Sequence, residues 1–178
     1  MEKGKAAVTD FEAQQMAAND GKEISMKQLM TSSTGIIENV MELLIHYKAI
    51  ISECFQGEAL FSRHLEFAFS EFMNLEVGKY SMSELLANYA DKILKKGGLK
   101  TERESYEDHI THVVTLFTFL VDKDLFLMVY RNQLARRLLN DKSEDIEFER
   151  QFITQLKVTC GMSQINLLSG MLQDKAIA

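Results

Sequence analysis

The chain has 178 residues, 46% of them apolar and 26% charged, which suits one globular domain or one domain with part of a second. It contains no Pro and only nine Gly, and because helices exclude Pro from their interiors, this composition predicts an all-α fold. The formal net charge of −6 argues against a general nucleic-acid-binding protein, although it allows a local basic patch.

The two cysteines and the apolar runs indicate the cell compartment in which the protein is expected. Cys54 and Cys160 lie far apart and outside any Cys-x-x-Cys spacing, so neither a disulfide framework nor a zinc site is predicted. We expect buried thiols in a reducing compartment. The first residues contain no apolar leader core, and no apolar run reaches the ~18 residues of a membrane helix. We therefore expect a cytoplasmic or nuclear protein without membrane association.

The N-terminal segment carries weak helical signals. Residues 9–18 predict a short helix, with Asn19-Asp20-Gly21 as its stop. Residues 22–34 show no clear period and predict a loop with one helical turn. From Gly35 to Phe55 apolar residues recur at the three-and-four spacing of a helix with one buried face.

A second helix of the same kind follows the Gln56-Gly57 break. Its apolar stripe begins at Phe61, and the helix is expected to end near Asn74. Residues 75–80 predict a connector. Ser81 or Ser83 is suited to cap the next helix.

That next helix is expected to stop at Gly97-Gly98, where a left-handed residue costs little. After a polar stretch, an apolar face from Ile110 to Val121 predicts another helix, and residues 123–139 predict one more. We expect the inward side chains of these helices and the last ones to form the core: Leu85, Leu86, Tyr89, Phe117, Phe126, Tyr130, Leu134, Leu138, Phe152 and Leu156.

The C-terminal part closes with one long helix and a short apolar tail. Ser143 or Asp145 is expected to cap the long helix, and Gly161 to end it. Residues 165–172 predict a short helix or a strand. The best domain boundary lies in residues 75–82, because about four helices joined by short turns follow it, as in a bundle.

The last third carries the most specific pattern in the chain. Its residues are Asp122-Lys123-Asp124, Tyr130, the run Leu134-Ala135-Arg136-Arg137-Leu138-Leu139, Leu156-Lys157, Cys160-Gly161, Gly170-Met171 and Asp174. Together with Ile36–Asn74 and Ser83–Lys96, in this order and at this spacing, the pattern resembles the cullins, the helical scaffolds of multi-subunit ubiquitin ligases. After Cys160-Gly161 the chain departs from the family pattern, which predicts different packing at that end.

The resemblance implies an architecture and a role. Residues 1–76 would be the terminal part of a cullin-repeat helical domain, and residues 77–178 a four-helix bundle at the start of the cullin homology domain. The segment would position the substrate-adaptor end and the RING end of a cullin-RING ubiquitin ligase. It would meet the RING-box protein and the ubiquitin-conjugating enzyme through the parent cullin, and a substrate adaptor only through regions that are not among these 178 residues. The chain is then either a fragment or a shortened relative.

A basic cluster surrounds the Gly97-Gly98 helix end: Lys92, Lys95, Lys96, Lys100 and Arg103. One interpretation is structural, because the C-terminal end of a helix carries a partial negative charge that favours cations. The other follows from the resemblance, since cullins use basic residues in this part of the bundle to attract the acidic tail of a ubiquitin-conjugating enzyme.

Arg136 and Arg137 have a structural interpretation. With Leu134 and Leu138 facing inward, at least one guanidinium is expected to lie across a neighbouring helix and pair with a carboxylate such as Asp122 or Asp124. Nucleic-acid contact is disfavoured because stacking aromatic side chains are sparse nearby.

Catalysis and metal binding are disfavoured. His109 and His112 lack the Glu-x-x-His spacing of helical metal centres, and Cys160 ends an apolar face without an adjacent base, as a buried inert thiol does. We predict a non-catalytic scaffold without cofactor or metal. The alternative is a free-standing helical protein-interaction module without ligase activity, and an enzymatic bundle is a third hypothesis.

Overall fold

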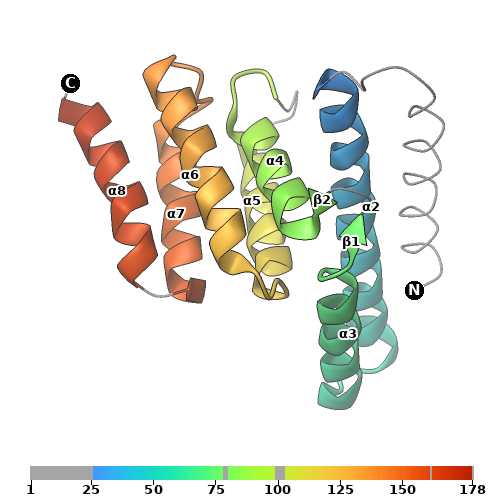
Figure 1. The fold of residues 1–178 in the computed structure, drawn as a ribbon. Coiled ribbons are helices and arrows are strands. Elements are labelled where there is room, and N and C mark those ends of the chain that lie inside the picture. The colour runs from blue at the N-terminus through green and yellow to red at the C-terminus, as the bar shows by residue number, and fades with distance from the viewer. Residues whose placement is uncertain (1–25, 78–79, 99–102, 161, 178) are drawn as a thin grey trace, which may run out of the picture. The chain divides into compact units, whose positions relative to one another are not determined.

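The computed structural model describes residues 26–77, 80–98, 103–160 and 162–177. The helix predicted over residues 9–18 lies outside them. The fold is all-α, as predicted, with one short hairpin between helices, and element labels follow Figure 1. The chain divides into two compact units: unit 1 comprises Met1–Leu85 with Phe119–Val121, and unit 2 comprises Leu86–Thr118 with Asp122–Ala178.

Unit 1 is built on a pair of helices, α2 (Met26–Cys54) and α3 (Ala59–Phe72). Gln56 and Gly57 in the turn between them have φ angles of 51° and 72°, in the left-handed region. The loop predicted over residues 22–34 is wrong for its described part, because α2 already begins at Met26. Met26, Leu29 and Met30 do recur at helical spacing, but the polar residues 31–34 interrupt the apolar stripe that reports a buried helix face.

The connector after α3 is a small antiparallel hairpin. Strands β1 (Glu76–Val77) and β2 (Tyr80–Ser81) pair with Glu76 opposite Ser81. Helix α4 (Met82–Leu94) then begins with a reciprocal cap. The Ser81 amide donates to Glu84 Oε2 at 3.0 Å, and the Glu84 amide donates to Ser81 Oγ at 3.3 Å. Ser81 is therefore the cap, of the two serines considered.

Asn74 ties a distant tripeptide into unit 1. Its Nδ2 donates to the carbonyls of Ser70 (2.6 Å) and Phe119 (2.9 Å), and its Oδ1 accepts from the Val121 amide at 2.8 Å. Helix α5 (Arg103–Thr118) thus ends before this tripeptide, and the Val121 side chain is 80% exposed. The prediction that Val121 continues the apolar helical face is wrong, because the chain turns at Asn74's amide.

Unit 2 contains the part of α4 from Leu86 onward and all of α5. It also contains α6 (Lys123–Leu139), α7 (Ile146–Cys160) and α8 (Met162–Ile177). Figure 1 shows these helices side by side. The apolar tail is a helix, α8, which decides between the two alternatives for residues 165–172. The Asp122 carboxylate caps α6 by accepting from the Leu125 amide at 3.0 Å. Asp145 caps α7 by accepting from the Glu147 amide at 2.8 Å.

An aromatic column runs through unit 2. The ring centroids of Phe117 and Phe126 lie 4.9 Å apart, those of Phe126 and Tyr130 6.0 Å apart, and those of Tyr130 and Phe152 5.1 Å apart. These rings are fully buried, and every side chain predicted for the core is buried as well. Aromatic pairs at such separations add to the free energy of burial by about 0.5–1.5 kcal/mol each.

Candidate functional site

The predicted basic cluster lies at the C-terminal end of α4. Lys95 and Lys96 are exposed and Lys92 is half-buried. Lys100 lies outside the described residues, and Arg103 is the first residue of α5, without a described side chain. The helix itself ends at Leu94, slightly before the expected glycine stop. The structure therefore brings together the two exposed lysines that directly follow α4.

Two glycines shape this helix end. Gly97 has a φ of 70°, in the left-handed region where side chains are strained. A Cβ atom on Gly98 would lie 1.7 Å from the carbonyl oxygen of Lys92, so only glycine fits there. The prediction that these glycines end the helix is wrong by three residues, because α4 ends at Leu94; the glycines instead allow a close approach of backbone to backbone just after it.

The turn between α6 and α7 pairs with this helix end. The Lys96 amide donates to the Lys142 carbonyl and the Glu144 amide donates to the Leu94 carbonyl, both at 2.9 Å. Lys95 and Ser143 form an antiparallel bridge between them. We call residues 140–145 the α6–α7 turn. The backbone after α4 is thus held by the α6–α7 turn, which follows it in the chain by more than 40 residues. Local sequence patterns do not reveal such a contact.

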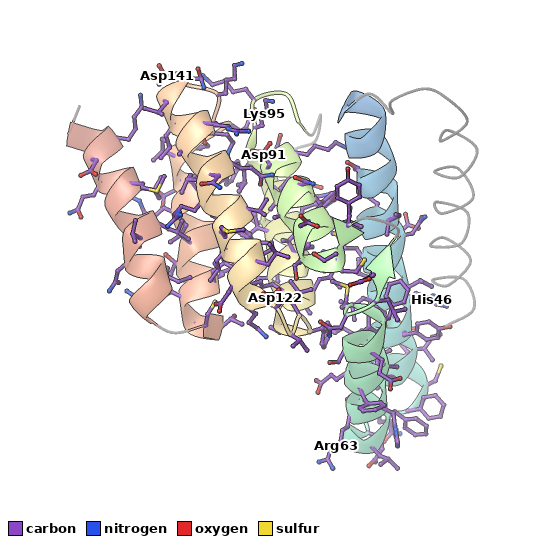
Figure 2. All side chains as sticks on the ribbon, viewed as in Figure 1. His46, Arg63, Asp91, Lys95, Asp122 and Asp141 are labelled. Atoms are coloured by element: carbon purple, nitrogen blue, oxygen red, sulfur yellow. The ribbon has the colours of Figure 1, made fainter. Side chains whose placement is uncertain are left out.

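Charges of both signs surround the helix end. The Glu144 carboxylate accepts from the Gly97 amide at 2.9 Å, and Lys175 Nζ lies 2.7 Å from Asp141 Oδ1. The hydrogen bond and charge of Lys175, with a contribution from Lys96, lower the pKa of Asp141 below its ordinary value. Figure 2 shows Lys95 and Asp141 at the same end of unit 2. The acidic turn residues therefore offset part of the positive potential of the lysines.

A hollow of about 500 Å³ lies beside this end of unit 2. The residues that line it come from the segment after α4, the end of α6, the α6–α7 turn, the start of α7 and α8: Lys96, Arg137, Leu138, Asp141, Ser143, Glu144, Asp145, Ile146 and Lys175. Acidic and basic groups both line it, which gives no strong preference for an anion or a cation.

Beneath the turn, Arg137 and Glu149 form a buried ion pair. Arg137 is 2% exposed and Glu149 is fully buried. Arg137 Nε donates to Glu149 Oε1 at 2.7 Å and Nη2 donates to Oε2 at 2.9 Å, a two-pronged arrangement that fixes both groups. Arg137 Nη1 also donates to the carboxylate of Asp91 on α4.

Two hydroxyl groups complete the coordination of Glu149. Tyr130 donates to Oε2 at 3.0 Å and Ser143 donates to Oε1 at 2.8 Å, so each carboxylate oxygen accepts two hydrogen bonds. Burial, and then the charge of Glu149, raise the pKa of Tyr130 well above its ordinary value. Burial disfavours the charged form of Arg137, but the hydrogen bond to Glu149 and the surrounding charges outweigh it and raise the pKa of Arg137. We call Arg137, Glu149, Asp91, Tyr130 and Ser143 the buried network.

The predicted partners of Arg137 are wrong. Asp122 precedes Arg137 by 15 residues on the same helix, which at about 1.5 Å per residue is roughly 22 Å. Figure 2 shows Asp122 far from Asp141 along the unit, at the other end. The expectation that one of the two arginines crosses to a neighbouring helix is confirmed by Arg137, whereas Arg136 is exposed.

Glu149 and Asp91 were not among the predicted site residues. One signal for Glu149 is present in the sequence: it stands three, four and seven residues before Phe152, Ile153 and Leu156, on the apolar stripe of α7. A carboxylate in such a stripe is rarely buried without a partner. Ser143, considered as a helix cap, instead joins the buried network, and its α7 cap role falls to Asp145.

The remaining candidates have structural surroundings. Tyr130, Leu134 and Leu138 are buried, and Gly161 lies outside the described residues. Cys160 is half-buried; its Sγ donates to the Leu156 carbonyl at 3.2 Å, and burial raises the pKa of its thiol, which lowers its reactivity. Cys54 is exposed, so the expectation that both thiols are buried is wrong.

Metal-binding groups do not converge in the described part of the chain. Within residues 26–77, 80–98, 103–160 and 162–177 no three His, Cys, Asp or Glu side chains could share an ion. His109 Nδ1 instead lies 3.1 Å from the hydroxyl of Tyr89. Among the same residues, no helix has the length and apolar character needed to cross a membrane.

Comparison with known proteins gives consistent matches. The family model described as "Cullin alpha solenoid domain" matches residues 2–178. Cullin-1 of Oryza sativa subsp. japonica is 44% identical over 143 residues, which are 80% of this chain and 19% of the rice protein. Cullin-2 of Arabidopsis thaliana is 37% identical over 164 residues, 91% of this chain and 22% of that protein.

A fungal relative matches over a similar span. Cullin-1 of Schizosaccharomyces pombe is 34% identical over 146 residues, 78% of this chain and 19% of that protein. The chain therefore spans about a fifth of the length of these relatives. Because the family model covers nearly the whole chain and the helical architecture agrees with its description, this protein belongs to the cullin family.

Proposed function

We propose that this chain is a scaffold segment of a cullin-RING ubiquitin ligase and has no catalytic residue of its own. The observation that carries the proposal is the cullin family match over residues 2–178. The buried aromatic column and the buried network support the proposal. Close-packed side chains, each held in one conformation, resist deformation, as a scaffold requires. A stiff segment between two binding modules raises the effective concentration of one for the other.

The proposed partners act through a longer cullin. The segment would help to position a RING-box protein and a ubiquitin-conjugating enzyme at one end and a substrate adaptor at the other, in the cytoplasm or nucleus. Lys95 and Lys96 are the candidate docking residues for the acidic tail of the conjugating enzyme. Their exposure supports this role, and the nearby Asp141 and Glu144 limit its strength.

Segment exchange tests the scaffold role. The matching stretch of the rice Cullin-1 is replaced by this chain, and ubiquitin transfer to an adaptor-bound substrate is measured. We expect the chimera to support transfer, because the packed core carries the required shape. The control chimera has Leu138→Asp, which places an unpaired charge at a buried position and should unfold unit 2. A chimera that folds and binds both adaptor and RING-box protein, yet transfers no ubiquitin, would contradict the proposal.

A charge reversal tests the docking residues. Lys95→Glu with Lys96→Glu in the chimera should slow transfer, most at low salt, because steering of charged partners is screened by ions. The matched control reverses two exposed cations elsewhere, Lys48→Glu with Arg63→Glu, for the same change in net charge. Equal rates for the two double variants at every salt concentration would remove the docking role.

A free-standing interaction module remains the second candidate, and one observation favours it. Unit 1 has an apolar hollow of about 150 Å³ between α2 and α3. Its lining is apolar apart from one tyrosine hydroxyl: Val40, Leu43, Tyr47, Leu65, Ala68, Phe69 and Phe72. Failure of the chimera to bind the RING-box protein, with both units folded, would favour this alternative.

A further inference from the structure

We infer that the hydrogen bond from Ser143 to Glu149 is a latch that positions the end of α4. It holds the α6–α7 turn against that helix end and so fixes the backbone of Lys95 and Lys96. The role of the latch in docking rests on the proposed function. The latch itself rests only on the geometry of unit 2.

The acceptor of the latch is held by several hydrogen bonds. Glu149 is fully buried, and Arg137 grips both of its oxygens while Arg137 is itself held by Asp91. Tyr130 adds a further hydrogen bond to Oε2. Because moving this carboxylate would leave buried charges without partners, its position is the most strongly defined point near the turn.

The donor of the latch sits at the centre of the backbone pairing. Ser143 is 8% exposed, and it is the turn residue that bridges to Lys95. The residues on either side of it, Lys142 and Glu144, make the hydrogen bonds to Lys96 and Leu94. One side-chain bond therefore sets the position of three consecutive turn residues, and through them the first residues after α4.

One residue beside this pairing has a backbone conformation that needs external support. Asp141 has a φ of 50°, in the left-handed region that is unfavourable for residues other than glycine. Gly97, on the other side of the pairing, has a φ of 70°, which glycine adopts without strain, and its amide donates to the Glu144 carboxylate. Without the latch, we expect the turn and the helix end to separate locally while the ion pair of Arg137 and Glu149 persists.

Amide hydrogen exchange of Ser143→Ala in this chain tests the latch. The variant removes the donor hydroxyl and keeps the ion pair. Exchange at the Lys96 and Glu144 amides should accelerate about tenfold or more, as expected for the loss of a hydrogen bond to a charged acceptor. The amides of Leu134 and Leu156, in the middle of α6 and α7, should keep their wild-type rates.

Two further variants make the test specific. Thr154→Ala removes an exposed hydroxyl from α7 that bonds only the Arg150 carbonyl, and should leave the Lys96 and Glu144 amides unchanged. Ser143→Cys keeps a weaker donor of similar size and should give an intermediate acceleration. Wild-type exchange at Lys96 and Glu144 in Ser143→Ala, or equal acceleration of all slow amides in unit 2, would overturn the latch.

Binding of a Glu-rich peptide separates the latch from the docking proposal. The wild-type chain should bind the peptide at low salt, and Ser143→Ala should bind it more weakly because Lys95 and Lys96 are no longer held together. If the wild-type chain does not bind the peptide, the docking role fails while the exchange result still decides the latch. Equal affinity of the two chains, with exchange accelerated, would exclude the latch from docking.

Discussion

The interiors of the two units are stabilised by different kinds of contact. In unit 1, α2 and α3 pack through apolar side chains, leave an apolar hollow open between them, and use the amide of Asn74 to hold residues 119–121. Unit 2 encloses its aromatic column and adds an ion pair that is almost fully buried. Apolar contacts tolerate adjustment, whereas a buried charge is stable only in one arrangement of its partners. We therefore expect unit 2 to tolerate substitution less than unit 1.

Removing the buried carboxylate should have the largest effect. Glu149→Leu leaves the Arg137 charge with Asp91 alone, and should lower the free energy of unfolding of unit 2 by about 3–5 kcal/mol. Hydrogen exchange with denaturant measures the two units separately. The control Glu53→Leu, at an exposed position of α2, should change stability by about 0.5 kcal/mol at most.

The double variant Arg137→Met with Glu149→Leu sharpens this test. It removes both charges, so it should recover part of the lost stability. A single Glu149→Leu variant as stable as the wild type would show that the network does not distinguish the units.

Matched leucine truncations compare the two cores directly. Leu156→Ala, at a fully buried position of unit 2, should cost about 2–5 kcal/mol because it removes apolar contacts and leaves a cavity. Leu65→Ala, at a half-buried position that lines the hollow of unit 1, should cost about 1 kcal/mol. Denaturant titrations followed by hydrogen exchange measure both. Equal losses would mean that the hollow is packed as tightly as the core of unit 2.

The exposed pair of Asp141 and Lys175 should have the smallest effect. The hydrogen bond from Lys175 lowers the pKa of Asp141 in the folded state, so the pair stabilises the fold above the unfolded pKa. This stabilisation is lost as the pH falls through the folded pKa. In Lys175→Gln, a carboxyl titration by nuclear magnetic resonance should show the pKa of Asp141 rising toward 3.8.

Salt provides the check on this interpretation. Added salt should raise the pKa of Asp141 in the wild type, because the pair is exposed and therefore screened. An unchanged pKa in Lys175→Gln would assign the shift to another group. Comparing the small effect of Lys175→Gln with the large effect of Glu149→Leu tests whether burial of an ion pair, rather than charge alone, gives unit 2 its rigidity.

Helix boundaries were predictable where capping residues mark them. The predicted range 123–139 agrees with α6, whose N-cap is Asp122, and the Cys160 end of α7 was also predicted. The start of α2 was missed because the polar residues 31–34 separate Met26, Leu29 and Met30 from the apolar stripe that begins at Ile36. The end of α5 was misplaced because Asn74, 45 residues before Phe119, decides where the chain turns. Contacts over such separations leave no local pattern.

The site was predictable only in part for the same reason. The leucines around Arg137 predict that its side chain points inward. Its partners, however, are Asp91, 46 residues before it on α4, and Glu149, 12 residues after it on α7. A scan of apolar stripes for isolated carboxylates would have found Glu149. It would not have found Asp91 or the bridge from Ser143 to Lys95, which depend on how the helices assemble.

The tripeptide held by Asn74 has a consequence for synthesis on the ribosome. Unit 1 takes Phe119–Val121 from a part of the chain that follows all of α5. Domains usually fold in order as they emerge. Here unit 1 stays incomplete until translation has passed Val121. While most of α4 and all of α5 are being made, the side-chain amide of Asn74 has neither the Phe119 carbonyl nor the Val121 amide to bond. Any gene fragment that stops at Leu85 would encode this unit without its last three residues.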